Sequence, residues 1–86
     1  MSYRLDYAPG AQRSIERLGR ELQNRILARI GLLSTDPRPP GAIKLTGQDA
    51  YRIRVGDYRI IYTIHDDRLL VLVIDVGHRR DVYRRR

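Results

Sequence analysis

Arginines alternate with apolar residues in one short stretch of the chain, and this spacing is suited to binding an anion. Residues 51–59 read Y-R-I-R-V-G-D-Y-R. Side chains two positions apart on a strand point to one face, so Arg52 and Arg54 would lie together. A guanidinium binds phosphate through two parallel hydrogen bonds, which makes phosphate a fitting ligand. The alternative is an ordinary solvated strand face, because arginine side chains are long enough to splay apart.

A Gly-Asp dipeptide separates the two basic strands. As a two-residue hairpin loop it would set Val55 opposite Tyr58 and Arg54 opposite Arg59. Like charges directly opposite each other destabilise a sheet, by a few tenths to about 1 kcal/mol. A bound anion would offset that repulsion. We therefore expect Arg52, Arg54 and Arg59 to form an anion site on one face of a sheet.

The composition is that of one small, strongly basic domain spanning residues 1–86. The chain carries 17 basic and 10 acidic residues, a net charge of +7, and Lys44 is its single lysine. Nucleic acid, an anionic membrane surface or an acidic protein are the partners that such a charge suggests. The longest apolar run, Leu69 to Ile74, is too short to span a membrane, so no membrane role is expected. The absence of cysteine fits the cytoplasm.

Hydrophobic periodicity divides the N-terminal half into a strand and helices. Residues 2–7 alternate between apolar and polar side chains, which predicts a short strand. Apolar residues then recur at spacings of three and four, which predicts helices at about 9–18 and 20–34, separated or bent at Gly19. Three prolines within 34–41 exclude both helix and central strand from that loop.

The C-terminal half predicts a short strand around Lys44, followed by three antiparallel strands joined by two hairpins. If Asp66 and Asp67 form the second loop, the cross-strand pairs are Ile64–Leu69, Tyr62–Val71 and Ile60–Val73. The opposite face then carries Arg52, Arg54 and Arg59 with Ile61, Thr63, Leu70, Leu72 and Ile74. This face is too apolar to be left to water, so we expect the chain's tail, a partner polypeptide or a ligand to cover it.

The expected fold is therefore α+β, in the order β-α-α-β-β-β. Two N-terminal helices pack on one face of a small, mostly antiparallel sheet. The sequence contains no glycine-rich phosphate loop, no metal-ligand spacing and no Ser-His-Asp order, so neither a cofactor nor a metal is expected.

The chain resembles RelE-type toxins of bacterial and archaeal toxin–antitoxin pairs, within the RelE/ParE superfamily. The resemblance covers essentially the whole length. Four fragments carry it: Lys44-Leu45-x-Gly47, the run from Tyr51 to Tyr62, the apolar strand 69–76, and Val76-Gly77-His78-Arg79 followed by Tyr83.

The resemblance implies a small RelE-like fold and a ribosome-dependent endoribonuclease that cuts messenger RNA in the decoding A site. The ribose 2′-hydroxyl is the nucleophile, and a cyclic phosphate remains. The implied partners are the ribosome, messenger RNA and a cognate antitoxin with an acidic, amphipathic segment. The toxin–antitoxin complex is expected to be a higher-order assembly.

The resemblance also assigns roles to the arginines. Arg52 and Arg54 contact phosphates and help to activate the nucleophile, and Arg59 steadies the phosphate. Arg79 stabilises charge and protonates the leaving group. Arg80, in the same basic tail, is expected to contact RNA.

Two further positions follow from the resemblance. Tyr83 positions the substrate or stacks on it, although packing as a cap on the sheet edge is an alternative. Lys44 is expected to contact RNA. Family members often have lysine where this chain has Arg52 and Arg54. Arginine is a poor proton acceptor because its pKa lies above about 12.

Either a proton acceptor comes from elsewhere in the chain or proton transfer is loose. His78 is a candidate acceptor because imidazole titrates near neutral pH. His65, beside the second loop, is expected to be an exposed turn residue. The acids Asp49, Asp75 and Asp81 show no paired arrangement, so a two-carboxylate mechanism is not expected. Two other functions remain open: a ParE-like toxin that inhibits DNA gyrase, and a catalytically inactive module that binds RNA or antitoxin.

Overall fold

The structure is a computed structural model, and it describes residues 2–78. The elements in chain order are β1 (Arg4–Tyr7), α1 (Pro9–Glu16), α2 (Arg20–Leu32), β2 (Ile43–Lys44), β3 (Tyr51–Val55), β4 (Tyr58–His65), a 3-10 helix (Asp66–Arg68) and β5 (Leu70–His78). The strands form one sheet in the order β1-β5-β4-β3-β2. The β1–β5 pair is parallel and the other pairs are antiparallel, which confirms the expected α+β fold.

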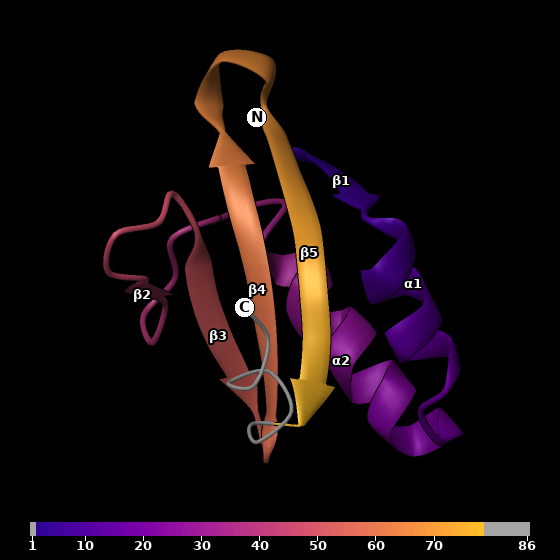
Figure 1. The fold of residues 1–86 in the computed structure, drawn as a ribbon. Helices are drawn as coiled ribbons and strands as arrows, with labels where there is room; N and C mark the ends of the chain where they lie inside the picture. Colours follow the sequence, from indigo (N-terminus) through magenta and orange to yellow (C-terminus); the bar gives the residue numbers. More distant parts are fainter. Residues whose placement is uncertain (1, 79–86) are drawn as a thin grey trace.

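Both helices lie on one side of the sheet (Figure 1). Pro9 occupies the first turn of α1, where its missing N–H removes no helical hydrogen bond. Gly19 is extended, with φ −61° and ψ 155°, and separates α1 from α2 as predicted. The apolar stripes of the two helices bury Ala11, Ile15, Ile26, Ile30 and Leu33 against the sheet.

The first hairpin has the predicted register. Val55 pairs with Tyr58 and Arg54 pairs with Arg59 across the β3–β4 turn. Of the two turn residues, Gly56 takes a positive φ of 59° and Asp57 does not, which is the glycine-first pattern of a tight hairpin turn. Local turn chemistry therefore sets the arginine pairing.

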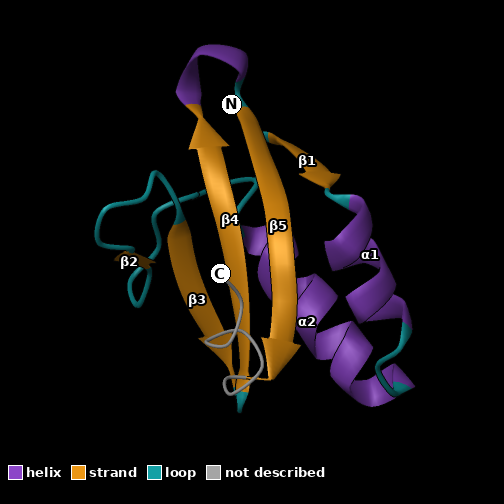
Figure 2. Cartoon of the chain, viewed as in Figure 1, coloured by secondary structure: helices purple, strands orange, loops and turns teal. Residues whose placement is uncertain are grey.

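The second hairpin differs from the prediction. Residues 66–68 form one turn of 3-10 helix, and Leu69 closes the loop in the left-handed region with φ 50°; Figure 2 shows this turn between β4 and β5. An Asp-Asp pair lacks the glycine that a two-residue loop favours, so the loop is longer. The observed pairs are Ile64–Val71, Tyr62–Val73 and Ile60–Val76, in place of Ile64–Leu69, Tyr62–Val71 and Ile60–Val73.

A β-bulge between Ile61 and Tyr62 adds a second change. Tyr62 pairs with Val73, but Ile61 pairs with Asp75, so Ile74 is the extra residue on β5. An extra residue reverses the side to which later side chains point. Val76 therefore faces the helices and is 2% exposed, while Asp75 is placed on the opposite face.

A polar cluster joins the loop after α2 to the far end of the sheet. Arg38 holds Asp66 through two hydrogen bonds, Nη2 to Oδ2 at 2.9 Å and Nη1 to Oδ1 at 3.3 Å. Tyr3 donates its hydroxyl to Asp66 Oδ1 at 2.6 Å. The Arg38 guanidinium also lies 5.6 Å from the centre of the Tyr51 ring. The hydrogen bonds from Arg38 and then Tyr3 lower the pKa of Asp66.

The Tyr62 hydroxyl fixes the same loop from inside. It donates to the Pro37 carbonyl oxygen at 2.8 Å, and the Tyr62 side chain is fully buried. Burial, followed by the nearby Tyr51, raises the pKa of Tyr62 to about 12. The loop is thus held at one end of the sheet, away from the β3–β4 turn.

Asp66→Asn is expected to lower the Tm at neutral pH, because Arg38 and Tyr3 lose their charged acceptor. The pKa of Asp66 is lowered in the folded protein. Its stabilisation is therefore present above the pKa of an unfolded aspartate, about 3.9, and is lost as the pH falls through the lower folded value. Thermal unfolding measured from pH 7 downward should show that the difference in Tm between wild type and Asp66→Asn becomes smaller in the acid range.

Asp67→Asn is the matched control, because it removes the neighbouring exposed carboxylate. We expect it to keep the wild-type Tm throughout. Equal Tm values for wild type and Asp66→Asn at pH 7 would contradict the stabilising role of the cluster.

Candidate functional site

The face of the sheet opposite the helices, here called the arginine face, carries the three strand arginines. Ile53, Val55 and Ile60 are buried on the helix side. Their neighbours Arg52, Arg54 and Arg59 must point the other way, because side chains alternate along a strand. The register sets Arg54 opposite Arg59, and Arg52 opposite Ile61. The structure therefore brings together three of the predicted site residues.

The three arginines differ in exposure. Arg59 is 4% exposed, Arg52 is half-buried and Arg54 is exposed. The Nε atom of Arg52 is buried and has no hydrogen-bond partner among residues 2–78. A buried donor of this kind costs about 1–3 kcal/mol unless it is satisfied. An anionic ligand with several oxygen acceptors would satisfy it, which supports an anion site here.

The third strand adds a glycine to this site. Gly77 on β5 pairs with Arg59, so the row across the sheet is Arg54–Arg59–Gly77. Gly77 contributes no side chain to the arginine face. The next row is Arg52–Ile61–Asp75. The β-bulge at Ile74 therefore places a carboxylate beside the arginines.

His78 is not placed with the arginines. It pairs with Tyr58, which lies opposite buried Val55 on the helix side. Its ring meets the Tyr58 ring edge-on, with centroids 5.6 Å apart at 77°. The position predicted as a proton acceptor therefore belongs to the opposite face of the sheet.

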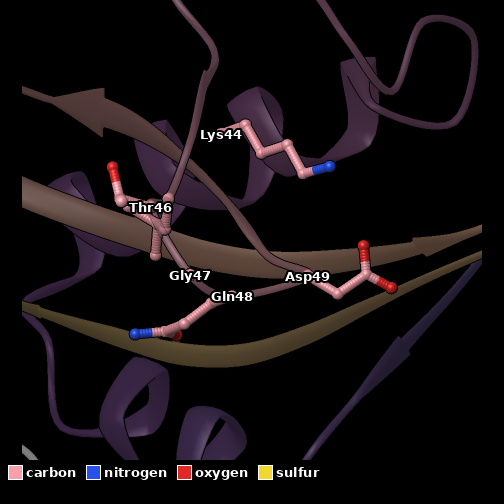
Figure 3. Close-up of a pocket in the computed structure, with 6 residues that line it drawn as sticks. Lys44, Thr46, Gly47, Gln48 and Asp49 are labelled. Carbon is pink, nitrogen blue, oxygen red and sulfur yellow. The ribbon is translucent and has the colours of Figure 1, made fainter.

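Lys44 is also apart from the arginine face. It pairs with Tyr51, whereas its neighbour Ile43 pairs with Arg52. Lys44 therefore lies on the helix-side register at the β2 edge, and its side chain is exposed. Figure 3 shows Lys44 and Asp49 among the residues that line a pocket formed by residues 44–49. The contact of Lys44 with RNA stays a prediction.

The predicted residues Arg79, Arg80 and Tyr83 lie outside the described residues, so their roles also stay predictions. β5 ends at His78, which pairs with Tyr58 next to the β3–β4 turn. His78, the last described residue, therefore lies at the end of the sheet that holds Arg54 and Arg59.

Sequence reasoning missed Asp75 as a member of this face. A regular strand from Leu70 to Val76 puts Ile74 on the arginine face and Asp75 on the helix side. The signal was present in the spacing of the valines: Val71 and Val73 are two apart, but Val76 follows after three residues. An apolar spacing of three in a strand indicates a bulge that keeps both ends on the core side.

The described part of the chain, residues 2–78, contains no group of three His, Cys, Asp or Glu side chains that could hold a metal ion. None of its helices is long and apolar enough to cross a membrane. The site is instead a set of fixed positive charges. Such charges can bind a phosphate and stabilise negative charge that develops on it.

Comparisons with known proteins cover nearly the whole chain. A family model described as the ParE toxin of the type II toxin–antitoxin system parDE matches residues 5–83. The chain is 32% identical to Toxin RelG of Mycobacterium tuberculosis, over 99% of this chain and 100% of that protein. It is also 32% identical to the mRNA interferase toxin RelE of Escherichia coli K12, over 92% of this chain and 85% of that protein.

The fold agrees with these relatives. A chain in the crystal structure of the intact E. coli RelBE toxin–antitoxin complex matches with a TM-score of 0.80 and 29% identity, covering 90% of this chain and 96% of that chain. Sequence, length and fold thus agree in placing the chain in the RelE/ParE superfamily of type II toxins, as a RelE-type toxin.

Proposed function

We propose that this toxin is a ribosome-dependent endoribonuclease that cleaves messenger RNA in the ribosomal A site. The single observation that carries the proposal is the set of three guanidinium groups on one sheet face, two of them paired directly across β3 and β4. Like charges directly opposite each other destabilise a sheet, and a bound anion would offset that repulsion. The name of the E. coli relative, an mRNA interferase, supports messenger RNA as the source of that anion.

The proposed reaction is attack of a ribose 2′-hydroxyl on the adjacent phosphate. The phosphorane transition state carries more negative charge than the ground state. Preorganised cations aimed at this charge are often the largest catalytic term. Arg54 and Arg59 hold the phosphate in this scheme, and Arg52 binds it from the neighbouring row. The reaction as proposed needs no metal ion.

The C-terminal segment completes the proposed site. Arg79 stabilises the transition state and protonates the leaving 5′-oxygen, and Tyr83 holds a base by stacking. RNA bases splayed from their neighbours are commonly held in this way. Arg80 adds a phosphate contact. These roles rest on the resemblance to RelE-type toxins and on the position at which β5 delivers the chain.

We further propose that a cognate antitoxin inhibits the toxin by covering the arginine face with an acidic, amphipathic segment. The face is suited to such a segment because apolar Ile43 and Ile61 flank Arg52. Ile43 is 49% exposed at the edge of the sheet. The E. coli RelBE complex, in which the similar chain was solved with its antitoxin, supports this type of partner.

Primer extension on messenger RNA in a translating extract tests the proposal. We expect cuts within codons that disappear when ribosomes are removed. A ParE-like toxin that inhibits DNA gyrase is the alternative function. Gyrase-linked DNA breaks without RNA cleavage would support that alternative and contradict the nuclease.

Arg54→Ala is expected to reduce the single-turnover cleavage rate about 10²–10³-fold, because one charge-stabilising donor is lost. Arg54 is exposed, so the fold should tolerate the change. Arg13→Ala is the matched control, since Arg13 is an exposed arginine on α1 and lies on the other side of the sheet. Equal rates for the two variants, measured on programmed ribosomes, would rule out a catalytic arginine face.

Arg79→Ala and Tyr83→Ala are expected to abolish growth inhibition while retaining antitoxin binding, because the proposed roles of both residues concern RNA alone. The measurements are colony formation after induction and co-purification with the antitoxin. Full toxicity in both variants would contradict the proposed site.

A further inference from the structure

The proposed reaction needs a proton acceptor, and the three arginines predicted for the arginine face do not supply one. Guanidinium groups remain protonated at neutral pH, so Arg52, Arg54 and Arg59 can donate hydrogen bonds but cannot take the proton of a 2′-hydroxyl. His78 points to the helix side and packs on Tyr58. Within residues 2–78, a proton acceptor would therefore have to be another group of the same face.

The β-bulge supplies a carboxylate at that face. Ile61 lies between Arg52 and Asp75 in one row of the sheet, and Asp75 is half-buried. Neighbouring strands are about 4.8 Å apart, so the backbones of Arg52 and Asp75 are about 10 Å apart. Arg59 is the diagonal neighbour of Asp75, at a backbone separation of roughly 7–8 Å. A phosphate held between the arginines of β3 and β4 would thus have the carboxylate along its β5 side.

The other acids of residues 2–78 are less suitably placed. Asp6 shares the arginine face, but it lies on β1 opposite Leu72, and β5 separates it from β4. Asp66 lies at the far end of the β4–β5 hairpin. Asp57 lies in the β3–β4 turn and is exposed. On the strands that carry the arginines or pair directly with them, Asp75 is the carboxylate that the register brings beside the cluster.

We propose that Asp75 is the general base that activates the 2′-hydroxyl, an inference that rests on the ribonuclease function proposed above. The 2′-hydroxyl proton passes to the Asp75 carboxylate as O2′ forms its bond to phosphorus. The bond from phosphorus to the 5′-oxygen breaks, and that oxygen takes up a proton. The products are a 2′,3′-cyclic phosphate and a 5′-hydroxyl.

The charged groups around Asp75 are known from the register. Arg52 and Arg54 face it from β3, and Arg59 faces it from β4. On the other side, β1 pairs only with residues 70–73 of β5, so Arg4 and Asp6 lie beyond it along the strand. Three cations therefore lie on one flank of this carboxylate, next to the site where the phosphate would bind.

The test is the single-turnover cleavage of messenger RNA in the A site of purified ribosomes by Asp75→Asn, from pH 6.5 to 8.5. We expect a loss of about 10²–10⁴-fold at pH 7, the usual contribution of a general base. Hydroxide then replaces the carboxylate as proton acceptor. The rate of the variant should therefore rise about tenfold per pH unit, so that its deficit relative to wild type shrinks at high pH.

Three controls make the result specific. Asp57→Asn removes a carboxylate from the same end of the sheet and is expected to cleave at the wild-type rate. Asp75→Glu keeps a base and is expected to recover part of the loss. Binding of ribosomes programmed with messenger RNA that carries a 2′-deoxyribose at the cleaved position should be unchanged in Asp75→Asn.

A substrate with sulfur in place of the leaving 5′-oxygen separates the base from the acid, because a thiolate leaves without a proton. This substrate should not rescue Asp75→Asn. Three outcomes would overturn the assignment of Asp75. They are rescue of Asp75→Asn by the sulfur substrate, a wild-type rate for Asp75→Asn, and a reduced rate whose pH profile is parallel to that of wild type. Failure of the wild-type protein to cleave any ribosome-bound messenger RNA would instead overturn the proposed ribonuclease, and the Asp75 role with it.

Discussion

Two guanidinium groups face each other across neighbouring strands, Arg54 on β3 and Arg59 on β4, and the rest of the described structure serves to maintain that pairing. Gly56 makes the tight turn that sets the register. Ile53 and Ile60 form the next cross-strand pair and are fully buried beneath the helices. A shift of one residue would move these isoleucines to the open face, so their burial holds the arginines in place against their own repulsion.

The two ends of the sheet differ in their contacts and charge. At one end, Arg38, Asp66 and Tyr3 join the loop after α2 to the β4–β5 hairpin. At the other end, the arginines meet the point where β5 finishes, and the chain continues from there into its basic C-terminal segment. Because stabilising contacts are concentrated at the first end of the sheet, the second end can carry like charges. Such an end is suited to binding an anion and to being covered by an acidic partner.

Local patterns predicted much of this fold. The helices, the break at Gly19 and the first hairpin follow from apolar spacing and turn residues within a few positions of one another. Local patterns did not predict the β4–β5 register, because this register depends on a longer loop and on a β-bulge. The bulge allows both Val73 and Val76 to be buried, and this gain exists only once the helices are in place. As a result the positions of the three strand arginines were predicted, whereas the position of Asp75 and the orientation of His78 were missed.

The central claim is that this arginine face promotes attack of a ribose hydroxyl on its own phosphate. The most direct measurement is mass spectrometry of the new ends of a short messenger RNA cut by the purified toxin on programmed ribosomes. The account predicts a 2′,3′-cyclic phosphate on the upstream fragment and a 5′-hydroxyl on the downstream fragment. A 3′-hydroxyl with a 5′-phosphate, which requires attack by water, would contradict it.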